Sequence, residues 1–183
     1  MRYISILRGI NVGGHKKIKM ADLKALYLSI GLTEVVTYIQ SGNVIFNTPS
    51  LNQDEISTLI ADAIKEKYSF DVPVMIRTAN AWESIIQKYP FSVNTLKNLT
   101  TVLVTLLSDK PTEASVKTLM EYVNTPDYLV IDEKNIYLYT PNGYGKTKLS
   151  NNFIEKKLKV KATTRNWKSI LKLYELSRGE KDV

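Results

Sequence analysis

The chain has 183 residues, with 25 Lys and Arg, 18 Asp and Glu, a single His and no Cys, and 44% of its residues are hydrophobic. This length and composition predict either one compact domain or two small packed halves with a sizeable core. The absence of Cys excludes disulfides, zinc ribbons, iron–sulfur clusters and thiolate nucleophiles, and one His excludes a multi-histidine metal site. We therefore predict no metal site.

The net charge of +7 is concentrated in the last quarter of the chain. Residues 1–140 hold 14 basic and 14 acidic side chains, whereas residues 141–183 hold 11 basic and 4 acidic ones. Such asymmetry favours a phosphate-bearing partner, although a solvated, lysine-rich surface is the simpler explanation. We find no secretory signal and no run of 18 apolar residues, so we expect a cytoplasmic protein without a membrane-spanning segment.

The first half of the chain predicts the element order β-α-β-β-α-β. Runs of β-branched and aromatic residues place strands at residues 2–8, 34–40, 43–48 and 72–77. The first helix, 20–30, has apolar residues at i, i+3, i+4 and i+7. Ser50 and Gln53 resemble a capping box at the start of the second helix. A short helix capped by Asn80 and a linker then connect the two halves.

The second half repeats this order without any similarity in residue letters. Strands are expected at residues 100–107, 127–132, 135–140 and 159–163, with helices between them and a last helix from about Asn166. The order packs most simply as a ferredoxin-like unit, in which the right-handed crossover makes strands one and two parallel and strand three antiparallel to both. We predict an α+β fold of two such subdomains with mainly antiparallel sheets and a C-terminal helix. Their bounds are 1–78 and 100–183, with a connecting helix and linker at 79–99.

Two clusters of glycine and polar residues follow from this topology. In the first half, the loop after the first strand (Gly9–Gly14) and the hairpin tip (Gln40–Asn43) fall at one end of the sheet. Glycine amides beside Arg8 and two lysines are able to hold an anion, but Gly13 and Gly14 are equally explained by a turn that needs positive φ. The polar tip, which includes Ser41 and Asn43, is typical of turn chemistry alone.

In the second half, the loop Pro141–Lys148 and the segment Thr163–Asn166 share one sheet end. Gly145-Lys146-Thr147 matches the last letters of a P-loop, but the required earlier glycine is replaced by Thr140, so the full P-loop pattern is absent. A looser phosphate cradle, completed by Arg165 beside a helix capped by Thr164 or Asn166, is one interpretation. A capping motif with a surface arginine is the other.

At these segments the sequence resembles a bacterial family, domain of unknown function 1697. The matching stretches are Arg8-Gly9-Ile10-Asn11-Val12-Gly13-Gly14 with Met20, Ser41-Gly42-Asn43-Val44-Ile45-Phe46, Pro141-x-Gly143-x-Gly145-Lys146 with Lys148-Leu149, and Thr164-Arg165-Asn166-Trp167. The resemblance implies two α+β subdomains with some likeness to the ferredoxin-like fold, and it implies no activity. The signature residues of the family fall in the two clusters.

Our leading hypothesis is a phosphate-bearing ligand, held by Arg8 and the Gly13 and Gly14 amides from one cluster and by Lys146 and Arg165 from the other. The remaining candidate binding residues are Asn11, Ser41, Asn43, Gly145 and Asn166. If both sheet ends line one cleft, the clusters form a composite site. One alternative is an RNA- or DNA-binding module that uses the basic last quarter, with Tyr137 and Tyr139 as stacking residues. Another is a structural or protein-interaction module without a ligand. The sequence assigns no catalytic residue, cofactor or oligomeric state, and whether the protein is an enzyme stays open.

Overall fold

The computed structural model of the chain describes residues 1–49 and 52–179, which form two compact units. The first unit holds residues 1–84 together with the described residues from Lys172 onward, and the second holds residues 85–171. Among the described residues, the helices lack the length and apolar character needed to cross a bilayer.

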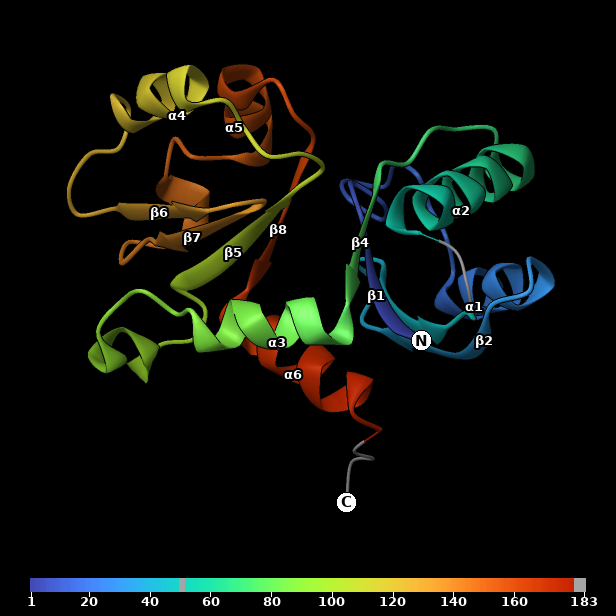
Figure 1. Ribbon diagram of the computed structural model, residues 1–183. Coiled ribbons are helices and arrows are strands. Elements are labelled where there is room, and N and C mark those ends of the chain that lie inside the picture. The colour runs from blue at the N-terminus through green and yellow to red at the C-terminus, as the bar shows by residue number, and fades with distance from the viewer. Residues whose placement is uncertain (50–51, 180–183) are drawn as a thin grey trace. The chain divides into compact units, whose positions relative to one another are not determined.

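The first unit is a four-stranded sheet with two helices on one face (Figure 1). Its strands, all antiparallel to their neighbours, lie in the order β2-β3-β1-β4. Their bounds are β1 (Arg2–Leu7), β2 (Thr33–Tyr38), β3 (Asn43–Asn47) and β4 (Val74–Thr78). The helices α1 (Met20–Ser29) and α2 (Gln53–Tyr68) bury their apolar faces against alternate strand residues, among them Tyr3, Leu7, Val44, Phe46 and Ile76.

The second unit repeats this arrangement, with strand order β6-β7-β5-β8 and antiparallel pairing throughout. Its elements are η1 (Val93–Lys97), β5 (Val102–Leu107), α4 (Glu113–Met120), β6 (Tyr128–Asp132), β7 (Asn135–Tyr139), η2 (Tyr144–Lys146), α5 (Asn151–Leu158) and β8 (Ala162–Asn166). The helices α4 and α5 lie side by side on one face of this sheet (Figure 1). Core residues beneath them include Leu103, Leu129, Leu138 and Ile154.

The described residues form two further helices: α3 (Ala79–Gln87) follows β4, and α6 (Trp167–Ser177) follows β8. In each sheet the first strand lies between the third and the fourth, with helices after the first and third strands, which is the ferredoxin-like order. The predicted α+β fold with two similar subdomains and a C-terminal helix is therefore confirmed.

The helix caps differ in detail from those that the sequence predicts. The predicted cap Ser50 lies outside the described residues, and α2 instead has a reciprocal capping box between Asn52 and Glu55. The helix α3 is capped by Thr78, whose hydroxyl accepts from Ala81 N–H at 3.1 Å, and not by Asn80. In both cases the cap is a polar side chain immediately before the first helical residue, Asn52 for α2 and Thr78 for α3.

The last strand, β8, is displaced from its predicted position at 159–163. Lys159 ends α5 in the left-handed conformation, with φ of 60°, and the strand begins only at Ala162. Thr163 to Asn166 thus belong to the strand itself and not to a loop after it, and the chain passes directly from Asn166 into α6. Alternate residues of this segment therefore face opposite sides of the sheet.

Candidate functional site

The predicted residues of the first cluster meet at one end of the first sheet. The Leu7 N–H donates to Gly42 O at 2.8 Å, which ties the end of β1 to the β2–β3 loop. The Asn11 amide nitrogen donates to Gln40 O at 2.7 Å and to Ile18 O at 2.9 Å. Its amide oxygen accepts from Ile18 N–H at 2.9 Å. Asn11 thus bridges the glycine-rich loop and the β2–β3 loop within the fold.

Gly13 and Gly14 form the tip of a tight turn in this loop. Their φ angles are 57° and 80°, and His15 N–H donates to Val12 O at 3.0 Å across the turn. Positive φ at both central residues is typical of a type I′ hairpin turn, which glycine adopts without strain. Both glycines are exposed. The turn explains why the sequence has two glycines here.

The other first-cluster residues are also held by contacts within the unit. Asn43 is fully buried, and its amide nitrogen donates to Tyr38 O at 3.0 Å and to Ser41 Oγ at 2.9 Å. The Arg8 backbone N–H donates to Pro73 O at 2.9 Å, and its side chain is half-buried. Ser41 and Asn43 therefore stabilise the loop that joins β2 to β3.

The two segments of the second cluster, the 141–148 loop and residues 163–166, meet at the predicted end of the second sheet. Their side chains, however, lie on both faces of that sheet. Tyr144 from the loop donates to Thr164 Oγ1 at 3.3 Å, and Thr164 also contacts Asn151 Oδ1 and Thr105 Oγ1, each at 2.6 Å. This hydroxyl network fixes the 141–148 loop against β8 and α5. Because strand residues alternate, the side chain of Arg165 is on the face opposite to that of Thr164.

Arg165 and Asn166 have structural contacts of their own. The Arg165 guanidinium donates to Thr163 Oγ1 at 3.0 Å and to Thr164 O at 2.9 Å, and burial lowers the pKa of Arg165 to about 10. Asn166 caps α6, since its Oδ1 accepts from Ser169 N–H at 2.9 Å. The predicted cap at Asn166 is present, and the predicted arginine is a partly buried group and not a surface one.

Gly145 and Lys146 lie in η2, the short turn between β7 and α5. The Lys146 N–H donates to Gly143 O at 3.0 Å, so this amide is already engaged within the turn. Lys146 also precedes the first residue of α5, Asn151, by five positions. The backbone around Gly145 and Lys146 therefore does not form a P-loop at a helix N-terminus. The exposed Lys146 side chain instead lines a cavity.

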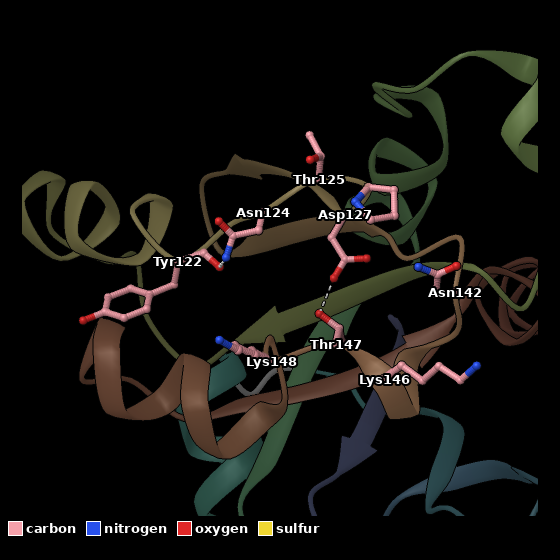
Figure 2. Close-up of a pocket in the computed structure, with 9 residues that line it drawn as sticks. Tyr122, Asn124, Thr125, Asp127, Asn142, Lys146, Thr147 and Lys148 are labelled. Atoms are coloured by element: carbon pink, nitrogen blue, oxygen red, sulfur yellow. Dashed lines mark hydrogen bonds between the residues drawn. The ribbon is translucent and has the colours of Figure 1, made fainter.

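This cavity, of about 350 Å³, lies in the second unit at the end of the sheet where β6 begins and β7 ends (Figure 2). One wall is the connection between α4 and β6, and the other is the loop after β7. The lining residues are Tyr122, Asn124, Thr125, Pro126, Asp127, Asn142, Lys146, Thr147 and Lys148. Thr147 donates to Asp127 Oδ2 at 2.6 Å and joins the two walls, as the dashed line in Figure 2 marks. We call this the 122–148 cavity.

The 122–148 cavity combines positive charge with neutral hydrogen-bonding groups. Lys146 and Lys148 supply two ammonium groups, and the two asparagines and two threonines among the lining residues supply amides and hydroxyls. Asp127 is the lone carboxylate of the lining, and Thr147 donates to it. The described residues contain no group of three or more His, Asp or Glu side chains placed to hold a metal ion.

Sequence reasoning identified Lys146 but missed residues 122–127. Those residues match no motif, and their polar side chains are typical of a loop. The topology offers the missing signal: β6 and β7 form a tight hairpin, so the start of β6 must lie beside the end of β7. The connection before β6 and the loop after β7 are therefore neighbours.

The fold and the cavity together define an α+β protein of two ferredoxin-like units, with a polar, lysine-bearing cavity in the second. Comparison with family models assigns the chain more narrowly. It belongs to the family described as "Protein of unknown function (DUF1697)", whose model matches residues 1–137. The match includes the first cluster and one wall of the 122–148 cavity.

A solved structure shares the whole fold. The conserved bacterial protein SP0830 from Streptococcus pneumoniae is 21% identical, with a TM-score of 0.76 over 96% of this chain and 98% of that one. At this identity the likeness concerns the fold. No curated protein matches the chain.

Proposed function

We propose that this protein binds a phosphate-bearing ligand, and that the phosphate lies in the 122–148 cavity. The observation that carries the proposal is the presence of two lysines, Lys146 and Lys148, in the lining of a cavity of about 350 Å³. That volume is in the range of small-molecule sites, which is about 300–1,000 Å³. A phosphate needs cations and several donors, and this lining offers both.

The electrostatics of the cavity and of the chain favour an anion. The lining holds two lysines and one carboxylate, and Asp127 already accepts a hydrogen bond from Thr147. The wider charge distribution adds to this, because the excess of +7 arises in residues 141–183, which include both lysines. A positive field over this part of the chain would steer anionic ligands toward the cavity.

Binding of ribose 5-phosphate and inorganic phosphate, followed by thermal shift and calorimetry, tests the proposal. A ligand at 100 times its Kd stabilises the folded protein by about 2.7 kcal/mol. Lys146→Ala and Lys148→Ala should each weaken binding. Lys156→Ala removes an exposed lysine of α5 that does not line the cavity, and it is the matched control. Equal affinity in all three variants would contradict the proposal.

The sequence also predicts that Arg8 and Arg165 contact the phosphate, and the same binding assay tests this prediction. Loss of affinity in Arg8→Ala or Arg165→Ala, at unchanged thermal stability, would add these arginines to the site. If neither phosphate compound nor any RNA or DNA binds, the structural or protein-interaction alternative is the better description of the protein.

A further inference from the structure

A row of aromatic rings runs through the second unit and ends at its surface. Trp167 is buried and lies 4.7 Å from Tyr89, measured between ring centroids. Tyr89 is 5.7 Å from Phe91, and Phe91 is 6.2 Å from Tyr139. Tyr139 is 6.3 Å from Tyr128, which closes the row. The row gives the outermost ring a rigid aromatic support.

Tyr128 is the exposed end of this row. It is 54% exposed, more than any other aromatic among the exposed large hydrophobic residues of the described chain. Tyr128 and Tyr139 are opposite each other on β6 and β7, and their rings are nearly parallel, 24° apart. One ring therefore backs the other. A flat ring from a ligand would extend this stack in the same geometry.

Other aromatic side chains nearby are less free to stack. Tyr137 is 1% exposed, and its hydroxyl donates to Ile85 O at 2.9 Å. Tyr122 is 39% exposed, but the Lys157 ammonium lies over its ring at 3.8 Å and Phe153 packs against it at 5.3 Å. The expected stacking pair Tyr137 and Tyr139 is thus replaced by Tyr128 and Tyr139.

The exposed ring is at the same sheet end as the 122–148 cavity. Asp127, which lines the cavity, directly precedes Tyr128, and Asn142 follows Tyr139 by three residues. Leu129 faces the core beneath α4 and α5, so Tyr128 is on the opposite face of the sheet. A ligand that joins the two features must have phosphate and flat rings on a flexible chain that bends around the sheet end.

We propose that the phosphate-bearing ligand is a single-stranded nucleic acid, with a backbone phosphate at Lys146 and Lys148 and a base stacked on Tyr128. This inference rests on the proposed function, since it assigns the same cavity to the phosphate. A single strand exposes its base faces, whereas a duplex hides them and a sugar phosphate has none. The excess of positive charge in residues 141–183 is complementary to such a polyanion.

The test is fluorescence anisotropy of the full chain with labelled ten-nucleotide RNA and DNA of one sequence, at several salt concentrations. Tyr128→Leu keeps an apolar side chain but removes the ring, and should weaken oligonucleotide binding by about tenfold. Tyr128→Phe keeps the ring and should bind within about twofold of the original. Melting temperatures establish that each variant is folded.

Two further readouts separate stacking from charge. Tyr128→Leu should leave the salt dependence unchanged, whereas Lys146→Ala should reduce the slope of log K against log salt by about 0.7. Tyr128→Leu should also leave the affinity for ribose 5-phosphate unchanged. Tight binding of RNA, of DNA or of both supports the proposal, and the comparison shows which sugar is preferred.

Specific results would overturn the inference. If ribose 5-phosphate binds in a lysine-dependent manner while Tyr128→Leu binds oligonucleotides normally, the nucleic-acid assignment fails and the proposed function stands. A duplex of the same sequence serves as a further probe. If it bound with the same affinity as the single strand, base stacking on Tyr128 would have no role. If neither lysine variant affects any phosphate compound, both proposals fail together.

Discussion

Arg165 occupies in the second sheet the position that Arg77 occupies in the first. Arg77 is opposite Ile4 on β1, and Arg165 is opposite Val104 on β5. Each arginine immediately precedes the strand's last residue, whose side chain caps the following helix. Burial lowers the pKa of both arginines to about 10. The two units therefore share a strand–arginine–cap–helix element, although their sequences show no evident similarity.

This equivalence predicts that Arg77→Lys and Arg165→Lys lose similar amounts of stability, about 1–2 kcal/mol each. Lysine keeps the charge but loses the planar group that donates to Ile76 O in one unit and to Thr163 and Thr164 in the other. Urea unfolding measures the loss. Arg178→Lys, at an exposed arginine, is the control and should change stability by less than about 0.5 kcal/mol. An Arg165→Lys protein of full stability but weakened phosphate affinity would favour a binding role for Arg165 instead.

Gly42 predicts a second, sharper effect on stability. A Cβ at Gly42 would lie 2.7 Å from Leu7 Cβ and 2.7 Å from Ile10 Cδ1, and φ there is 75°. Gly42→Ala therefore combines backbone strain with a clash, and should lose about 3 kcal/mol of unfolding free energy.

Gly14→Ala is the matched control for this substitution. Its φ is 80°, but a Cβ there meets nothing within 4 Å, so only strain of about 1 kcal/mol is expected. Urea unfolding of both variants separates the two effects. Equal losses would mean that the contact with Leu7 is relieved by small movements.

The strand order was predictable because it depends on the order of the strands and helices along the chain, and each of these is marked by a run of several apolar residues. Runs of apolar residues predict the strands at 127–132 and 135–140, which are only two residues apart, and the crossover rule then limits the topology. The start of β8 was not predictable. It depends on Lys159 in the left-handed conformation, a state that lysine does not signal.

The candidate site was predictable only in part, and for a related reason. Lys146 stood out because glycines and charges surround it, whereas Asn124 and Asp127 became visible only when β6 and β7 were paired. The burial of Arg165 could not be predicted, because no pattern in the neighbouring residues distinguishes a half-buried arginine from an exposed one.

Asn11 gives a prediction that separates structure from binding at the glycine-rich loop. Asn11→Ala removes three hydrogen bonds, to the N–H and O of Ile18 and to Gln40 O, and should lose about 2 kcal/mol. Hydrogen exchange should show faster exchange of the Ile18 amide. Unchanged exchange at Ile18 together with weaker phosphate binding would mean instead that Asn11 contacts a ligand.

Tyr137 predicts how stability depends on pH in the alkaline range. Burial, with a smaller contribution from Asp132, raises the pKa of Tyr137 from 10.0 to about 12 in the folded protein. Below pH 10 the phenol is protonated in both states, so it adds no pH dependence. Between pH 10 and 12 the unfolded chain loses this proton while the folded protein keeps it. The unfolding free energy then falls by about 2–3 kcal/mol as the pH rises.

Tyr137→Phe removes this titration and also the hydrogen bond to Ile85 O. At pH 8 the variant should be less stable than the original by about 1 kcal/mol. The difference should shrink above pH 10 and change sign before pH 12. Ionisation of Tyr137 then lowers the free energy of the unfolded original chain, and the variant has no such hydroxyl to ionise. Urea unfolding of both proteins at intervals from pH 8 to 12 measures the difference, in which the titration of other groups cancels. A difference that stays constant over this range would show that the Tyr137 hydroxyl ionises equally in the folded and unfolded states.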